Sequence, residues 1–177
     1  QIPFDMTTYI SESIHHVYRT FFEALVLVIL VVFLSLQNWR ATLIPMLAVP
    51  VSLIGTMAGL WLFGFSLNTL TLFGLVLAIA IVVDDAIVVV EAVKNHISNG
   101  EKPLPATIAA MREVSGPIVS TALVISCVFV PTLLLPGVSG KLFEQFAVTI
   151  AISMLISAFN ALTLSPALSA ILLKPKD

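Results

Sequence analysis

Two adjacent carboxylates, Asp84 and Asp85, are the residues of this sequence with the clearest potential for chemistry. They lie within "VVDDAIVVVEA", residues 82–92, one of the most apolar runs of the chain. An ionised Asp at the centre of a membrane helix costs about 2.5–3.5 kcal/mol on insertion scales, and two neighbours do not both stay charged there without a cation or water. Because such a pair titrates as a unit, it forms a site that can take up and release a proton.

The composition places these acids in a membrane protein. Charged residues make up 10% of the 177 residues and hydrophobic residues 59%, whereas about a quarter of the residues of a soluble domain are charged. From Ala41 to Val83 there are 43 consecutive residues without Asp, Glu, Lys or Arg. Since one span needs about 20 apolar residues, that run holds two spans.

We predict an all-α membrane protein, a polytopic bundle of five transmembrane helices, because the hydrocarbon offers no partner to unpaired backbone groups. The predicted spans cover residues 19–38, 41–63, 69–93, 117–135 and 146–172, within a transmembrane domain over residues 19–173. Residues 94–116 connect the third span to the fourth. Within them, "PATIAAMREV" predicts a short amphipathic helix that lies on the membrane surface.

The loop charges predict the orientation. One side receives six basic residues and the other two, namely Arg40, Lys94, Lys102, Arg112, Lys174 and Lys176 against Arg19 and Lys141. The positive-inside rule makes the side with six cytoplasmic. Residues 1–18 then lie outside, as the lead-in from an external domain, and residues 174–177 form a cytoplasmic end. Because there is no initiator Met or basic leader, we interpret the chain as a piece of a longer protein.

The helical repeat separates the two acids. Asp85 falls on a row of small residues, with Thr71, Ala78 and Ala92, so we expect it to face another helix. Asp84 is turned about 100° away, on the row of Leu70, Leu77 and Glu91. A static salt bridge is the alternative to a proton site, but no Lys or Arg lies at membrane depth in the five predicted spans.

Other small and polar residues are assigned to helix packing, to hydrogen bonds between helices and to accessory roles in a proton path. Close helix packing is predicted at Gly55, Gly59, Gly74 and Ala78. Thr149, Ser153 and Ser157 recur every four residues, and Asn160 continues near that face. This stripe predicts hydrogen bonds between helices, with a hydrated path as the alternative. The candidate accessory residues of a proton path are Glu23, Glu91, Thr149, Ser153 and Asn160.

The histidines give no sign of a metal site. His15, His16 and His96 lack metal-ligand spacing with acids or cysteines and are interpreted as surface residues. We therefore predict no metal and no cofactor other than protons as the coupling ion.

Four long segments of the chain form recognisable motifs, and they are "FLSLQNWRATLIPMLAVPVSLIGT", "GFSLNTLTLFGLVLAIAIVVDDAIVVVEAV", "VFVPTLLLPGVSGKLFEQFAVTIA" and "ALTLSPALSAILLKP". Together these segments resemble the resistance-nodulation-division (RND) efflux pumps of the hydrophobe/amphiphile branch. The resemblance covers nearly the whole chain, in order. It implies a transporter, not an enzyme, that exports hydrophobic or amphiphilic compounds by proton antiport.

The resemblance also implies a larger architecture. The family has twelve membrane helices in two halves, and this chain resembles helices two to six of the first half. Residues 1–18 would then be the tail of a periplasmic porter region, and Asp84 and Asp85 the proton relay, with its partner Lys in the absent second half. The implied setting is the bacterial inner membrane, as a homotrimer that works with a periplasmic adaptor and an outer-membrane channel. No nucleic-acid partner is expected.

The sequence departs from the family pattern at two small residues. Ala80 stands where Gly is common, and Ala92 stands where Asn is common. Both bear on packing more than on proton chemistry. The heavy-metal branch typically has a single Asp followed by Ala, so the pair here favours organic substrates.

Two alternative functions differ in what they require of the acid pair. An RND relative that moves lipids or another non-drug substrate would use the same relay, because external domains choose the substrate. An intramembrane aspartyl protease needs its two acids on different helices, whereas Asp84 and Asp85 are adjacent on one.

Overall fold

The computed structural model describes residues 6–66 and 68–174 as helices joined by short turns. The elements in chain order are α1 (Met6–Leu36), α2 (Trp39–Leu62), α3 (Thr69–Ser98), α4 (Pro103–Val128), the 3-10 helix η1 (Val130–Leu134), α5 (Gly137–Leu162) and α6 (Leu164–Leu172). Among the described residues, five helical segments are long and apolar enough to cross a membrane. The predicted all-α, polytopic fold is confirmed.

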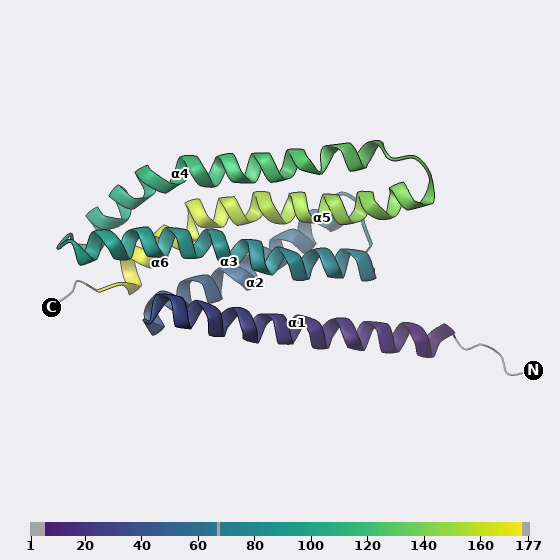
Figure 1. Ribbon diagram of the computed structural model, residues 1–177, viewed down its shortest axis with the longest axis horizontal. Helices are drawn as coiled ribbons and strands as arrows, with labels where there is room; N and C mark the ends of the chain where they lie inside the picture. The colour runs from purple at the N-terminus through teal and green to yellow at the C-terminus, as the bar shows by residue number, and fades with distance from the viewer. Residues whose placement is uncertain (1–5, 67, 175–177) are drawn as a thin grey trace, which may run out of the picture.

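The long helices run alternately up and down the bundle. Figure 1 shows the α1–α2 turn, the α3–α4 turn and the end of α6 at one end, and the α2–α3 and α4–α5 turns at the other. The first end carries Arg40, Lys94, Lys102 and Lys174, whereas Lys141 lies at the other. We call the first the basic end. The predicted separation of these loop charges is present, while the assignment of the basic end to the cytoplasm stays a prediction.

The third span is the central element of the bundle. α3 packs against each of α1, α2, α4, α5 and α6. Of its membrane-length segment 56% is buried, compared with 11% of the corresponding segments of α1 and α4. The acid pair therefore lies on a helix that packs against every other described α-helix.

Asparagines begin α2 and α3. Asn38 Oδ1 accepts the N–H of Arg40 at 3.0 Å. Asn68 Oδ1 accepts the N–H of Thr71 at 3.0 Å, and Thr71 Oγ1 accepts the N–H of Asn68 at 2.7 Å, which completes a capping box. This cap fixes where α3 starts. Asp84 then lies about 22 Å along α3, within the length of about 30 Å that a helix needs to cross the hydrocarbon.

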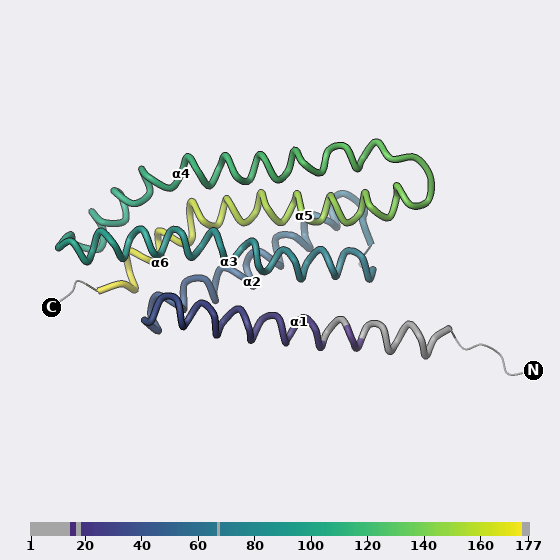
Figure 2. The backbone as a smooth tube through the Cα atoms, in the orientation of Figure 1, coloured from purple at the N-terminus to yellow at the C-terminus, as the bar shows by residue number. Residues whose placement is uncertain are grey.

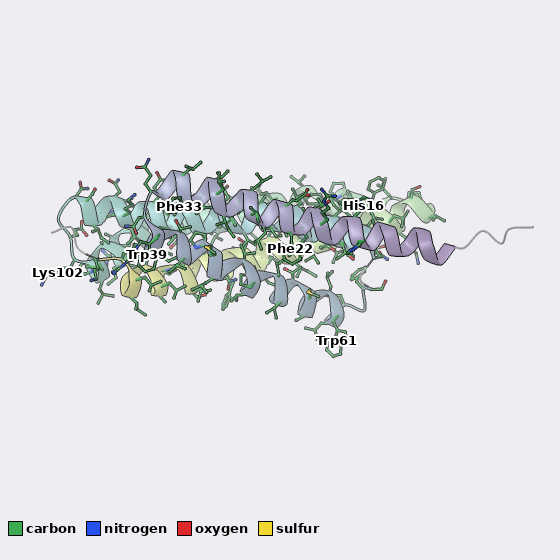
Figure 3. All side chains as sticks on the ribbon, turned by 90° about the horizontal axis from the view of Figure 1, so that it is seen from below. His16, Phe22, Phe33, Trp39, Trp61 and Lys102 are labelled. Carbon is green, nitrogen blue, oxygen red and sulfur yellow. The ribbon has the colours of Figure 1, made fainter. Side chains whose placement is uncertain are left out.

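Exposed tryptophans mark both ends of α2. Trp39 is 62% exposed and Trp61 is 78% exposed, and Figure 3 shows them toward opposite ends of this helix. Their helical separation of about 33 Å slightly exceeds the roughly 30 Å thickness of the hydrocarbon. Both tryptophans therefore occupy the positions of residues that anchor a helix at the two membrane interfaces.

One predicted connection differs from the structure. α3 continues to Ser98, and α4 runs without a break from Pro103 to Val128. The separate amphipathic helix predicted within residues 94–116 is therefore wrong, because its residues are the first part of α4. Pro103 begins this helix without the loss of a backbone hydrogen bond, since the first N–H of a helix has no intrahelical partner. The position of this part at a membrane surface stays a prediction.

Prolines divide the last two predicted spans. α5 ends at Leu162, and α6 begins at Leu164 and turns away from the line of α5 (Figure 2). Pro166 has no N–H to donate to the carbonyl of Leu162, but it fits the first turn of a new helix. Pro131 similarly lies in the first turn of η1, after α4 has ended.

The packing of α5 depends on residues without large side chains. A Cβ added to Gly59 would lie 2.7 Å from Ile152 Cγ2, and one added to Gly74 would lie 2.9 Å from Thr149 Cγ2. Both distances are shorter than van der Waals contact, so only glycine allows this approach. The predicted packing residues that face neighbouring helices are Gly55, Gly59, Gly74 and Ala78. As a result, α5 lies close enough to α3 for side chains to bond across.

Candidate functional site

Asp85 is buried between α3 and α5. It is 8% exposed, and Ser157 Oγ on α5 donates a hydrogen bond to Asp85 Oδ2 at 2.6 Å. The expectation that Asp85 faces another helix is confirmed. A single hydroxyl donor compensates only part of the hydration that a buried carboxylate loses. Within the part of the chain that the structure describes, no Lys or Arg forms an ion pair with this side chain.

Asp84 lies on a face of α3 that the other described helices leave uncovered. The residues that are exposed with it recur at helical spacing on one side of α3, and they are Phe73, Leu77, Ala80, Val88 and Glu91. Among residues 6–66 and 68–174, no hydrogen bond or ion pair involves the Asp84 side chain. The uncovered stripe thus presents Asp84 between apolar residues, with a second carboxylate, Glu91, closer to the basic end. Its apolar part is a surface of the kind that helices use for packing.

The hydroxyl stripe of α5 is buried, and its members differ in what they contact. Thr149 and Ser153 each donate to a backbone carbonyl of their own helix at 2.7 Å. Asn160 Nδ2 donates to Ser52 Oγ on α2 at 2.6 Å. Asn160 therefore makes the bond between helices that the stripe predicts, and Ser157 is the member that reaches an acid.

Sequence reasoning placed Ser157 on this stripe but did not connect it with Asp85. The spacing of four residues shows which side chains share a face of one helix. It does not give the register between α3 and α5, which Gly74 and its contact with Thr149 help to set.

The acidic accessory candidates lie apart from the pair. Glu23 on α1 forms an exposed ion pair with Arg19 at 2.8 Å. Glu91 is exposed on α3, about 10 Å along the helix from Asp84 on the same side. No hydrogen bond in the described ranges joins either of them to the acid pair. Their accessory role stays a prediction.

His96 is not the simple surface residue that its sequence position indicates. Its side chain is 19% exposed, and its ring nitrogens lie 2.9 Å from Glu101 Oε1 and 3.3 Å from Glu113 Oε1. The three residues connect the end of α3 to the loop and to α4. The sequence gives little sign of this contact, because Glu113 comes 17 residues after His96.

The geometry gives the two acids different environments on one helix. Asp85 points inward and is held by a hydroxyl, whereas Asp84 points to an uncovered face. A proton or cation that reaches Asp84 from that face would alter the charge beside a buried carboxylate. The two carboxylates are adjacent in sequence, so a change at one takes place next to the other.

Comparison with known proteins places the chain in one family. The family model described as the AcrB/AcrD/AcrF family matches residues 1–177. The chain is 51% identical over 174 residues to the multidrug export protein AcrF of Escherichia coli (strain K12), and 48% identical over 173 residues to the multidrug resistance protein MdtF of the same strain. It is 50% identical over 170 residues to the multidrug resistance protein MdtC of Pectobacterium atrosepticum.

These alignments cover 98%, 97% and 96% of this chain but 17% of each relative. The chain therefore spans about one sixth of the length of the relatives that it matches. The resemblance to RND multidrug pumps that the sequence motifs indicate is confirmed over nearly all of its residues. The chain belongs to the AcrB/AcrD/AcrF family of RND efflux transporters.

Proposed function

We propose that this chain supplies half of the proton-translocating membrane domain of a pump that exports hydrophobic or amphiphilic compounds by proton antiport. The observation that carries the proposal is the divided acid pair on α3. Asp85 is buried against Ser157 at 2.6 Å, while Asp84 faces away from the described helices. The relatives named multidrug export and multidrug resistance proteins support export as the activity.

Proton binding would act as a switch between two helix packings. A carboxylate on the uncovered face of α3 needs a cation on the helix that covers it, and protonation of the pair removes that attraction. The absent second half would provide the cation, a Lys. Each charge that moves through about 100 mV supplies about 2.3 kcal/mol, enough to bias an equilibrium between two packings.

The rest of the pump is proposed from the family. The chain would lie in the bacterial inner membrane as five of twelve helices, with residue 1 toward the periplasm and the basic end in the cytoplasm. The complete protein would be a homotrimer that works with a periplasmic adaptor and an outer-membrane channel. Lipids or another non-drug cargo remain the alternative substrate, since the segments that select it lie outside this chain.

Neutralising each acid in the full-length pump tests this function. We expect Asp84→Asn and Asp85→Asn each to abolish drug resistance in cells, because Asn keeps the shape but cannot carry the charge. Expression and membrane insertion should remain as in the wild type. Glu144→Gln is the matched control, since it removes a carboxylate outside the pair that makes no ion pair within the described ranges. Near-normal resistance in both Asp variants would exclude the relay.

A further inference from the structure

A basic cavity lies at the basic end of the bundle, where α1, α2 and α3 meet. Its volume is about 660 Å³. Arg40 of α2, Lys94 of α3 and Lys174, which follows α6, all line it, and its described lining contains no Asp or Glu. Three cations that converge without a carboxylate repel one another. The charge of the cavity is therefore complementary to an anion.

Two of these cations are held in place by the fold itself. Lys94 Nζ donates a hydrogen bond to the carbonyl of Leu36, at the end of α1, at 2.6 Å. The guanidinium carbon of Arg40 lies 5.3 Å from the centre of the Trp39 ring. An ammonium group has three donors and a guanidinium five, so both retain free donors that can reach an anion. Fixing them in advance lowers the entropy that binding costs.

An apolar groove adjoins the basic cavity. This second cavity, of about 440 Å³, lies between α1 and α2 and shares Phe33 and Trp39 with the first. It follows α1 from Val26 to Phe33, about 10 Å of helix, and Leu30 on its wall is 52% exposed. Figure 3 shows Phe33, Trp39 and Lys102 toward the same end of the molecule. The groove thus leads from the basic end toward the middle of the membrane.

We propose that the two cavities form one binding site for an anionic phospholipid. The phosphate headgroup binds Arg40, Lys94 and Lys174, and one acyl chain lies in the groove between α1 and α2. A soluble anion would match the cations but leave the groove unexplained. A zwitterionic lipid would fill the groove but leave the positive charge uncompensated. Lipid is always available to this site, because the helices cross a membrane. The proposed lipid site does not depend on the proposed proton coupling.

Lipid binding to the full-length pump tests the proposal. The purified pump is placed in nanodiscs with phosphatidylglycerol or phosphatidylcholine of identical acyl chains, and retained lipid is counted by native mass spectrometry. We expect phosphatidylglycerol to be retained preferentially. Arg40→Gln and Lys174→Gln should each weaken its retention about fivefold, as expected for the loss of one interfacial charge. Lys102→Gln, at the same end but outside the cavity, should leave it unchanged.

A second measurement locates the acyl chain without relying on charge variants. Phosphatidylglycerol with a photoreactive diazirine in one acyl chain should label the peptides of residues 26–46. Inorganic phosphate alone should not displace it, which separates a lipid site from a site for free phosphate. Three results would overturn the proposal: the two lipids are retained equally, the labelling is confined to other helices, or phosphate displaces the lipid. Labelling confined to other helices would show that another segment of the pump covers the groove.

Discussion

Ser157 Oγ lies 2.6 Å from Asp85 Oδ2, so a hydroxyl of α5 holds the inner acid of α3. This contact is the only side-chain hydrogen bond to either acid within the described ranges. It joins the acid pair to the helix against which α3 packs most closely at Gly74. A change of charge at Asp85 therefore changes the strength of its hydrogen bond to Ser157 on α5.

Removing the Ser157 hydroxyl should impair the pump without unfolding it. A hydrogen bond to a charged group is worth about 1.5–3 kcal/mol, and Ser157→Ala leaves Asp85 without its donor. We expect drug efflux in cells to fall about tenfold or more, since about 1.4 kcal/mol is a factor of ten. Ser157→Thr keeps the hydroxyl and should retain much of the rate. Equal efflux by the Ala variant and the wild type would show that the contact has no role in the cycle.

The Asn160 to Ser52 contact is expected to be structural. Interhelical hydrogen bonds in membranes average about 0.6 kcal/mol, so a double-mutant cycle of Asn160→Ala and Ser52→Ala should give a coupling of that size in thermal or denaturant unfolding. Efflux per folded pump should change little. A large loss of efflux with unchanged stability would instead favour the hydrated path along α5.

Gly59 should tolerate no side chain. A Cβ there would lie 2.7 Å from Ile152 Cγ2, and the branched Ile side chain has little freedom to move away. We expect Gly59→Ala to destabilise the full-length pump by about 1–3 kcal/mol, measured by thermal unfolding in detergent. Gly116→Ala is the control, because no atom outside its own helix segment lies within 4 Å of the added Cβ. A drop of equal size in both variants would mean that steric packing at α5 is not the cause.

The sequence predicted the spans and the divided acid pair for clear physical reasons. Long apolar runs must become helices in lipid, and the helical repeat turns Asp84 away from the small-residue row of Asp85. Proline chemistry explains two differences between the predicted and observed helices. Pro166 lies in the first turn of the separate helix α6, and α4 begins at Pro103, before the predicted fourth span. The register of α5 on α3 could not be predicted. It depends on the three-dimensional fit at Gly74, so the partner of Asp85 emerged only from the structure.

Proton flux through the complete pump tests the central claim most directly. The full-length protein is reconstituted in liposomes with a pH-sensitive dye inside, and drug-dependent proton movement is recorded for the wild type, Asp84→Asn and Asp85→Asn. We predict flux in the wild type and none in either variant, with drug binding preserved in all three. Normal drug-dependent proton flux in both Asn variants would contradict the assignment of the acid pair as the relay.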